Sequence, residues 1–150
     1  MPEFSIASRF CGPPGAANGG YLAGRLAAFA TTTVSVRLVK PVPLDVPLHV
    51  QDTAEGLELH HAGQLLATAR PTRLDLRVPH PPDYVTALAA SRHFLPFGHH
   101  PFPGCFVCGD QRHRGDGLRI FAGDSADHSM VAAPWMPDAS LDQGDGRVAP

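Results

Sequence analysis

The segment that most constrains the fold is residues 13–30, where a loop rich in proline and glycine leads directly into an apolar stretch of small residues. Asn18 stands at the junction, and because asparagine is a good helix cap, we expect a nearly buried helix from about Asn18 to about Ala30. The first N–H groups of a helix have no partner inside it. At Gly19 and Gly20 a ligand oxygen would approach the backbone closely, with the positive end of the helix dipole behind it. The start of this helix is therefore predicted to be a site for a carbonyl oxygen or an anion.

Alternation of apolar and polar side chains predicts several strands around this helix. The clearest is residues 31–39, because β-branched residues dominate it. Ala62 and Gly63 lie between two further alternating segments and predict a hairpin with a short turn. We expect strands at residues 4–10, 31–39, 48–51, 57–61 and 64–70, with residues 74–78 extending or following the last of them. The first part of the chain thus indicates a strand, a helix and several antiparallel strands, an α+β arrangement of two layers.

The rest of the chain shows less regular patterning. Residues 79–104 form a linker in which only residues 84–92 predict a helix, since the remainder is rich in Pro, Gly, His and Phe. A new unit is expected to begin at Cys105. Its alternation is sparse, and we expect strands only at residues 118–121 and 130–133. We therefore divide the chain into residues 1–78, 79–104 and 105–150.

Composition and charge argue against several classes of protein. The 150 residues suffice for one domain with a sizeable core, or for one domain and part of another. Charged residues make up 17% of the chain, below the average of about 25% for soluble domains, which indicates a surface covered by a partner subunit or a missing segment. The net charge of −2 and the lack of basic runs with interleaved aromatics argue against a nucleic-acid partner.

The sequence also carries signals about location. No apolar stretch is long enough to span a bilayer, and residues 1–5 do not begin a signal peptide, so no membrane partner is expected. Three cysteines, an odd number, argue against a disulfide framework and for a reducing compartment. We therefore expect a cytoplasmic protein.

Several stretches together resemble one known family. They are residues 18–23 at the start of the helix, 36–44 on the strand after it, 64–70 on a later strand, and 105–109 and 117–120 further along the chain. In these stretches and in the order of its elements, the chain resembles the hotdog-fold thioesterase superfamily, in particular its acyl-CoA thioesterase-like branch built from two tandem hotdog units. The resemblance covers residues 4–78 well and residues 103–138 in part. It implies an α+β hotdog fold, in which an antiparallel sheet wraps around a central helix, followed by an incomplete second hotdog-like unit.

The resemblance also implies a function. Family members use backbone N–H groups at the helix start to polarise a thioester carbonyl, and by resemblance Gly19 and Gly20 take that place. Together with Asn18, which precedes them, they are the expected catalytic positions. The residues expected to contact an acyl-CoA substrate are Tyr21, Arg37 and Lys40. The two cations would meet the phosphates of coenzyme A, with an exposed strand face as the alternative interpretation. Coenzyme A would be part of the substrate, so no fixed cofactor is expected.

The sequence leaves two functions open. Many hotdog hydrolases carry an Asp or Glu on or near the helix to activate water, but residues 18–30 contain no carboxylate. The chain is therefore either an acyl-CoA thioesterase-like hydrolase or a non-catalytic acyl-binding or structural hotdog protein. A single hotdog sheet leaves an apolar face and an edge uncovered, so we expect a homodimer, or a pairing of tandem units, with the acyl tunnel at the interface.

Cys105 and Cys108 raise the question of a metal or redox site. Their spacing with His113 matches the start of a zinc knuckle, which needs a fourth ligand. This chain has Leu118 where the knuckle would have a cysteine, and a redox C-x-x-C normally lies near a βαβ pattern, which is not predicted here. Two small, mostly buried cysteines are the favoured interpretation, with a zinc-linked interaction module as the alternative, and no metal site is assigned.

Overall fold

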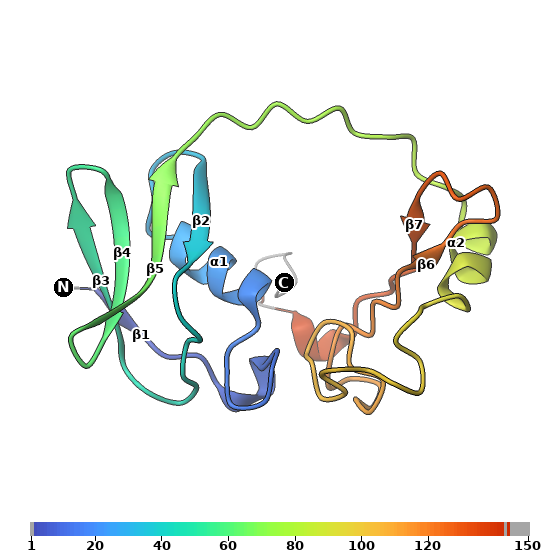
Figure 1. The fold of residues 1–150 in the computed structure, drawn as a ribbon, viewed down its shortest axis with the longest axis horizontal. Helices are drawn as coiled ribbons and strands as arrows, with labels where there is room; N and C mark the ends of the chain where they lie inside the picture. Colours follow the sequence, from blue (N-terminus) through green and yellow to red (C-terminus); the bar gives the residue numbers. More distant parts are fainter. Residues whose placement is uncertain (1, 143, 145–150) are drawn as a thin grey trace. The chain divides into compact units, whose positions relative to one another are not determined.

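In the computed structural model, which describes residues 2–142 and residue 144, the chain divides into two compact units. The first extends to Leu76 and the second begins at Arg77. Each unit contains a helix and antiparallel strands, as Figure 1 shows. The mixed α/β class expected from the sequence is thereby confirmed. The end of the region predicted at residues 105–150 lies outside the described residues.

The first unit is built on an antiparallel sheet of five strands. They are β1 (Glu3–Phe4), β2 (Val34–Leu38), β3 (Leu48–Thr53), β4 (Gly56–His61) and β5 (Gln64–Pro71). They lie in the order β1-β3-β4-β5-β2, so β1 and β2 form the two edges of the sheet in the described part of the chain. The last four strands match the predicted segments apart from a few residues at their ends.

The turn between β4 and β5 confirms the predicted hairpin. Ala62 and Gly63 both have positive φ, 48° and 75°, which is the backbone of a two-residue type I′ turn. At the start of β4, Gly56 has φ 133°, and a Cβ there would lie 2.2 Å from the carbonyl oxygen of Ala69. Only glycine therefore fits at this point of the ladder.

The strand predicted at residues 4–10 is only partly correct. β1 is two residues long, and the chain then forms a short 3₁₀ turn, η1 (Ser8–Phe10), in which the Phe10 N–H donates to the Ala7 carbonyl at 2.9 Å. The ring of Phe10 stacks on Tyr21, with the ring centroids 3.9 Å apart. This packing against the helix takes the chain away from the sheet, and the alternation within the segment does not reveal it.

The helix of the first unit, α1 (Gly19–Ala27), begins where Asn18 predicts and ends before the predicted Ala30. Its buried side chains are Tyr21, Leu22 and Leu26. They pack with apolar side chains of the sheet, whose fully buried members include Leu48, Val50, Leu59, Leu66, Ala67 and Ala69. The core of the first unit therefore lies between α1 and one face of the sheet (Figure 1).

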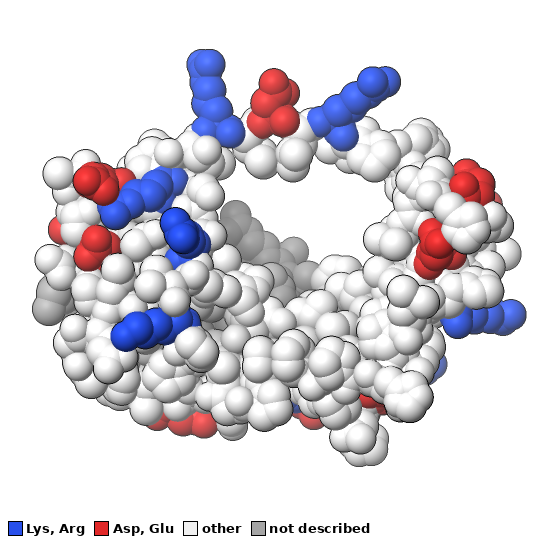
Figure 2. All heavy atoms as spheres, viewed as in Figure 1, with Lys and Arg blue, Asp and Glu red and all other residues white. Residues whose placement is uncertain are grey.

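The opposite face of the sheet is polar. Across β2 and β5, Arg37 is paired with Thr68 and Ser35 with Arg70, so these four side chains share one face. Figure 2 shows charged side chains of both signs over this unit. A sheet with one apolar and one polar face is typical of an antiparallel sheet that is covered on one side.

The second unit contains α2 (Tyr84–Ser91), β6 (Gly123–Asp124), β7 (Val131–Ala132) and a 3₁₀ turn, η2 (Ala139–Leu141). β6 and β7 form a two-stranded antiparallel sheet, and β7 confirms the strand predicted at residues 130–133. The helix predicted at residues 84–92 is also confirmed. It packs so closely on β6 that a Cβ at Gly123 would lie 2.0 Å from the carbonyl oxygen of Ala90. This helix, expected within a linker, thus belongs to the fold of the second unit.

The strand predicted at residues 118–121 is wrong. The N–H groups of Leu118 and Ile120 donate instead to the carbonyls of Phe106 and Val107, at 2.8 and 2.9 Å. These bonds tie the segment to the turn that contains the two cysteines. The apolar alternation of residues 118–121 therefore reflects packing of the segment on this turn, and the segment is not a strand of a sheet.

Candidate functional site

The loop before α1 is held in place by backbone hydrogen bonds. The Ala17 N–H donates to the carbonyl of Val42 at 2.8 Å, and the Asn18 N–H donates to the carbonyl of Phe10 at 2.8 Å. Gly12 closes the loop by donating to the carbonyl of Ala16 at 2.9 Å. The start of α1 is therefore positioned from both sides by main-chain bonds.

Asn18 caps α1 as predicted, and its side chain changes which N–H groups remain for a ligand. Its Oδ1 accepts from the N–H of Gly20 at 3.0 Å and from the N–H of Tyr21 at 3.1 Å. Its carbonyl accepts from the N–H of Leu22 at 2.9 Å. Among the residues that the structure describes, the Gly19 N–H is left without a hydrogen-bond partner. The expectation that Gly20 also offers an unpaired donor is not met.

Gly19 lies beside an apolar side chain of β2. A Cβ at Gly19 would lie 2.9 Å from Cδ1 of Leu38, so the glycine lets this side chain approach the start of α1. Leu38 is 49% exposed, and the adjacent Val39 is similarly exposed. A backbone donor at the positive end of a helix thus stands next to an accessible apolar surface. The sequence singled out Gly19 but not Leu38, because their contact arises from the packing of β2 on α1.

Tyr21 does not present its ring to a ligand. It is 6% exposed and stacks on Phe10, with an angle of 7° between the two rings. Arg25 lies 3.4 Å from its hydroxyl oxygen, measured from Nη1. The second position after the helix start faces the sheet, and the structure accordingly gives Tyr21 a packing role where the sequence predicted substrate contact.

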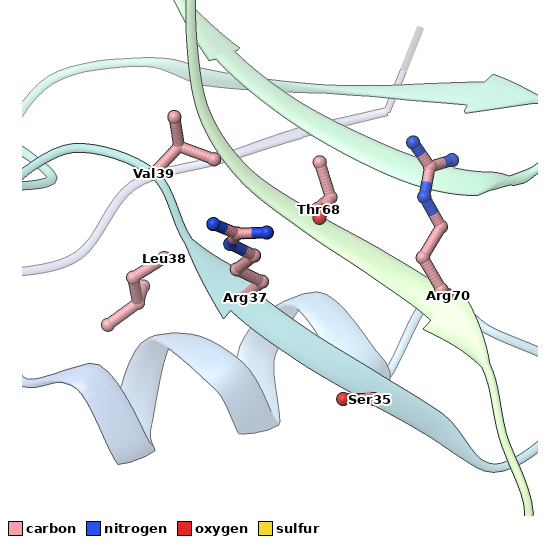
Figure 3. A pocket seen from close by; sticks show the side chains of 6 residues that line it. All are labelled: Ser35, Arg37, Leu38, Val39, Thr68 and Arg70. Atoms are coloured by element: carbon pink, nitrogen blue, oxygen red, sulfur yellow. The ribbon is translucent and has the colours of Figure 1, made fainter.

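Arg37 lies in a groove along β2 and β5, shown in Figure 3. The groove has a volume of about 530 Å³, and its lining residues are Ser35, Arg37, Leu38, Val39, Thr68 and Arg70. Arg70 is paired with Glu55 at 3.0 Å and with Glu58 at 3.6 Å. Within residues 2–142 no carboxylate pairs with Arg37, so its charge remains available to an anion.

The three predicted substrate contacts are not brought together. Arg37 and Leu38 are neighbours on a strand, so their side chains leave opposite faces of the sheet, and Leu38 is the one that reaches Gly19. Lys40 follows β2 and donates from Nζ to Oε1 of Gln64 at 3.2 Å. Arg37 and Lys40 therefore lie at the end of β2, while Tyr21 packs on the face of the sheet opposite Arg37.

Replacing Asn18 with alanine is expected to lower the free energy of unfolding by about 1 kcal/mol, because the N–H groups of Gly20 and Tyr21 lose the oxygen that accepts from them. Urea denaturation followed by circular dichroism measures the effect. Asn18→Asp keeps an acceptor oxygen and is the matched control, expected to stay within a few tenths of a kcal/mol of the native chain. An alanine variant as stable as the native chain would show that the cap does not hold the helix start.

Cys105 and Cys108 lie close together in the second unit, with their Sγ atoms 3.6 Å apart. Burial raises the pKa of the Cys108 thiol to about 11, helped by its hydrogen bond with Cys105 and by repulsion from that group. In the described part of the chain, no group of three or more His, Cys, Asp or Glu side chains is arranged to hold a metal ion. Neither His113 nor another described residue therefore extends the cysteine pair into the zinc knuckle considered from the sequence.

None of the helices in the described residues is long and apolar enough to cross a membrane. Comparison of the chain with protein-family models, with curated proteins and with solved structures finds no match.

Proposed function

We propose that the first unit is a hotdog-type domain that handles acyl thioesters, and that the Gly19 N–H donates to the thioester carbonyl. The observation that carries the proposal is the position of this N–H, which has no partner among the described residues, at the positive end of α1 and beside the exposed Leu38. The antiparallel sheet packed on α1 supports the fold, since the resemblance implies a sheet wrapped around a central helix.

The proposed chemistry follows from the charge that develops on the carbonyl oxygen. When a nucleophile adds to a thioester carbon, the oxygen becomes an oxyanion, and one preorganised donor is worth about 3 kcal/mol in the transition state. The helix dipole adds to the favourable potential at the same point. The exposed side chains of Leu38 and Val39 offer apolar surface to the acyl group. Arg37 and Lys40 would then meet the phosphates of coenzyme A at the end of β2.

The alternative is a non-catalytic acyl-binding or structural hotdog protein. Two observations favour it over hydrolysis. The Gly20 N–H is occupied by the side chain of Asn18, which leaves a single donor for an oxyanion. Residues 18–30 also contain no carboxylate to activate water.

A second copy of the chain is the proposed partner of the first unit. In the described residues β2 is paired only with β5, so its other edge is open. Leu38 and Val39 lie exposed at the end of this edge, and an open apolar edge is a surface that proteins normally cover. We therefore retain the homodimer expected from the sequence, with the acyl group held near the interface.

The experiment that tests the function is incubation of the chain with acyl-CoA esters of several chain lengths, with free coenzyme A separated and measured by chromatography. Catalytic release of coenzyme A supports the hydrolase. Binding measured by calorimetry without release supports the acyl-binding alternative. Neither binding nor release across the panel would contradict the thioester proposal in both forms.

A further inference from the structure

The turn that contains the two cysteines of the second unit is rigidly built. The Cys105 N–H donates to the carbonyl of Phe102, and the Gly109 N–H donates to the carbonyl of Cys105, both at 2.8 Å. Nε of Arg112 donates to the carbonyl of Gly104 at 2.8 Å. A Cβ at Gly109 would lie 2.4 Å from the carbonyl oxygen of Pro103, so the chain closes here as only glycine allows. The turn thus holds both cysteines in a fixed relation.

That relation places two thiols within reach of a covalent bond. The Sγ atoms are 3.6 Å apart, and a disulfide bond is about 2.05 Å long, so the sulfurs need to approach by roughly 1.5 Å. In the described residues no other metal-binding side chains gather at this point. We propose that Cys105 and Cys108 are a redox-responsive dithiol, which closes to an intramolecular disulfide by exchange with a small disulfide such as oxidised glutathione.

The exposure of the two thiols sets the order of the steps. Cys105 is 4% exposed, whereas Cys108 is half-buried and meets the reagent first. The Cys108 thiolate attacks one sulfur of oxidised glutathione, forming a mixed disulfide and releasing one glutathione thiolate. The Cys105 thiolate then attacks Sγ of Cys108 and releases the second. The two protons lost by the cysteines are taken up by the two glutathione thiolates, so the protein is oxidised by two electrons and the reagent is reduced by two.

The environment of Cys108 makes this a slow response. Its raised pKa leaves little thiolate near neutral pH, and the thiolate is the attacking species. The residues between the cysteines are hydrogen-bonded to Leu118 and Ile120, so closure of the disulfide acts directly on that segment. This inference concerns the second unit and does not depend on the thioester proposal.

The test uses the full chain carrying Cys11→Ser, which retains only the two thiols in question. The protein is incubated for several hours with excess oxidised glutathione, quenched with an alkylating reagent and analysed by intact mass and peptide mapping. We expect a product lighter by two hydrogen atoms, without alkylation or bound glutathione, that dithiothreitol reverses. The native chain is mapped in parallel and should show the same Cys105–Cys108 disulfide. This control shows that the disulfide does not arise from a change in fold caused by Cys11→Ser.

Single-cysteine variants test the order of attack. Adding Cys105→Ser should trap one glutathione on Cys108, because the resolving thiol is gone. Adding Cys108→Ser instead should slow adduct formation roughly tenfold, because Cys105 is buried. The unfolded protein serves as a control in which both thiols are alkylated. If both thiols of the folded protein are still alkylated after treatment with oxidised glutathione, the proposal is overturned. A stable glutathione adduct with both cysteines present, or a disulfide between two chains, would overturn it as well.

Discussion

Replacing Leu26 with alanine is expected to lower the free energy of unfolding by about 2–5 kcal/mol. Leu26 is 0% exposed and lies on α1 within the core shared with the sheet. Removing the side chain loses the transfer free energy of its buried methyl groups and leaves a cavity between helix and sheet. The large effect follows because α1 is short and buries only two other side chains, Tyr21 and Leu22.

Urea denaturation followed by far-UV circular dichroism measures this loss. Trp135 is the only tryptophan in the chain and lies in the second unit, so its fluorescence follows that unit separately. The matched control is Leu74→Ala, which makes the same chemical change at a side chain that is 70% exposed and is expected to stay within about 0.5 kcal/mol of the native chain. Equal effects of the two substitutions would contradict the position of Leu26 in the core.

The sequence was sufficient for elements that local chemistry specifies. Ala62 and Gly63 predict a hairpin because their place between two alternating runs suits a two-residue turn, and both residues have positive φ in the structure. Asn18 predicts the start of α1 because its side chain accepts from the N–H groups of Gly20 and Tyr21 in the first turn. Asp83 acts in the same way at the start of α2, where it accepts from the Thr86 N–H at 2.7 Å.

The sequence was insufficient where tertiary contacts decide the backbone. The alternation of residues 4–10 suits a strand, but the stacking of Phe10 on Tyr21 selects a 3₁₀ turn. At the other end of α1, the N–H groups of Phe29 and Ala30 donate to the carbonyls three residues before them, and these tighter bonds end the helix early.

The sequence motif at the start of α1 overestimates the number of backbone N–H donors that are available to a ligand. The residue type that makes the helix start predictable, asparagine, is also the one whose oxygen occupies the Gly20 N–H. The first turn of a helix has N–H groups without a partner inside the helix, but a side-chain cap occupies some of them. A capped helix therefore offers fewer donors to a ligand than an uncapped one. The contact of Leu38 with Gly19 could not be predicted for a different reason. Nothing within residues 13–30 indicates which part of β2 packs against the start of α1.

Replacing Gly19 with proline is expected to reduce thioester turnover about a hundredfold, because it removes the proposed carbonyl donor. If the chain only binds thioesters, the loss of one hydrogen bond is expected to weaken binding about fivefold. Gly19 is the first residue of α1, where proline is well tolerated since its missing N–H has no partner within the helix. Asn18 has φ −63° and ψ 130°, which is the backbone that a residue before proline adopts. The helix and its cap are therefore expected to persist.

Gly19→Ala is the matched control for this substitution. Alanine keeps the N–H but introduces the same Cβ, which meets Cδ1 of Leu38 at 2.9 Å in the native arrangement. The contact is with the far end of a flexible side chain, so the Cβ of either variant is accommodated by a small movement of Leu38. Circular dichroism of the two variants confirms that α1 is retained before activity is compared.

The most direct test is therefore a comparison of the two variants with one acyl-CoA ester. The quantity compared is kcat/KM where the native chain hydrolyses the ester, and Kd where the native chain only binds it. We expect Gly19→Ala to stay near the native value and Gly19→Pro to fall by about a hundredfold in turnover or about fivefold in binding. Equal values for the two folded variants would contradict the claim that the Gly19 N–H holds the thioester carbonyl.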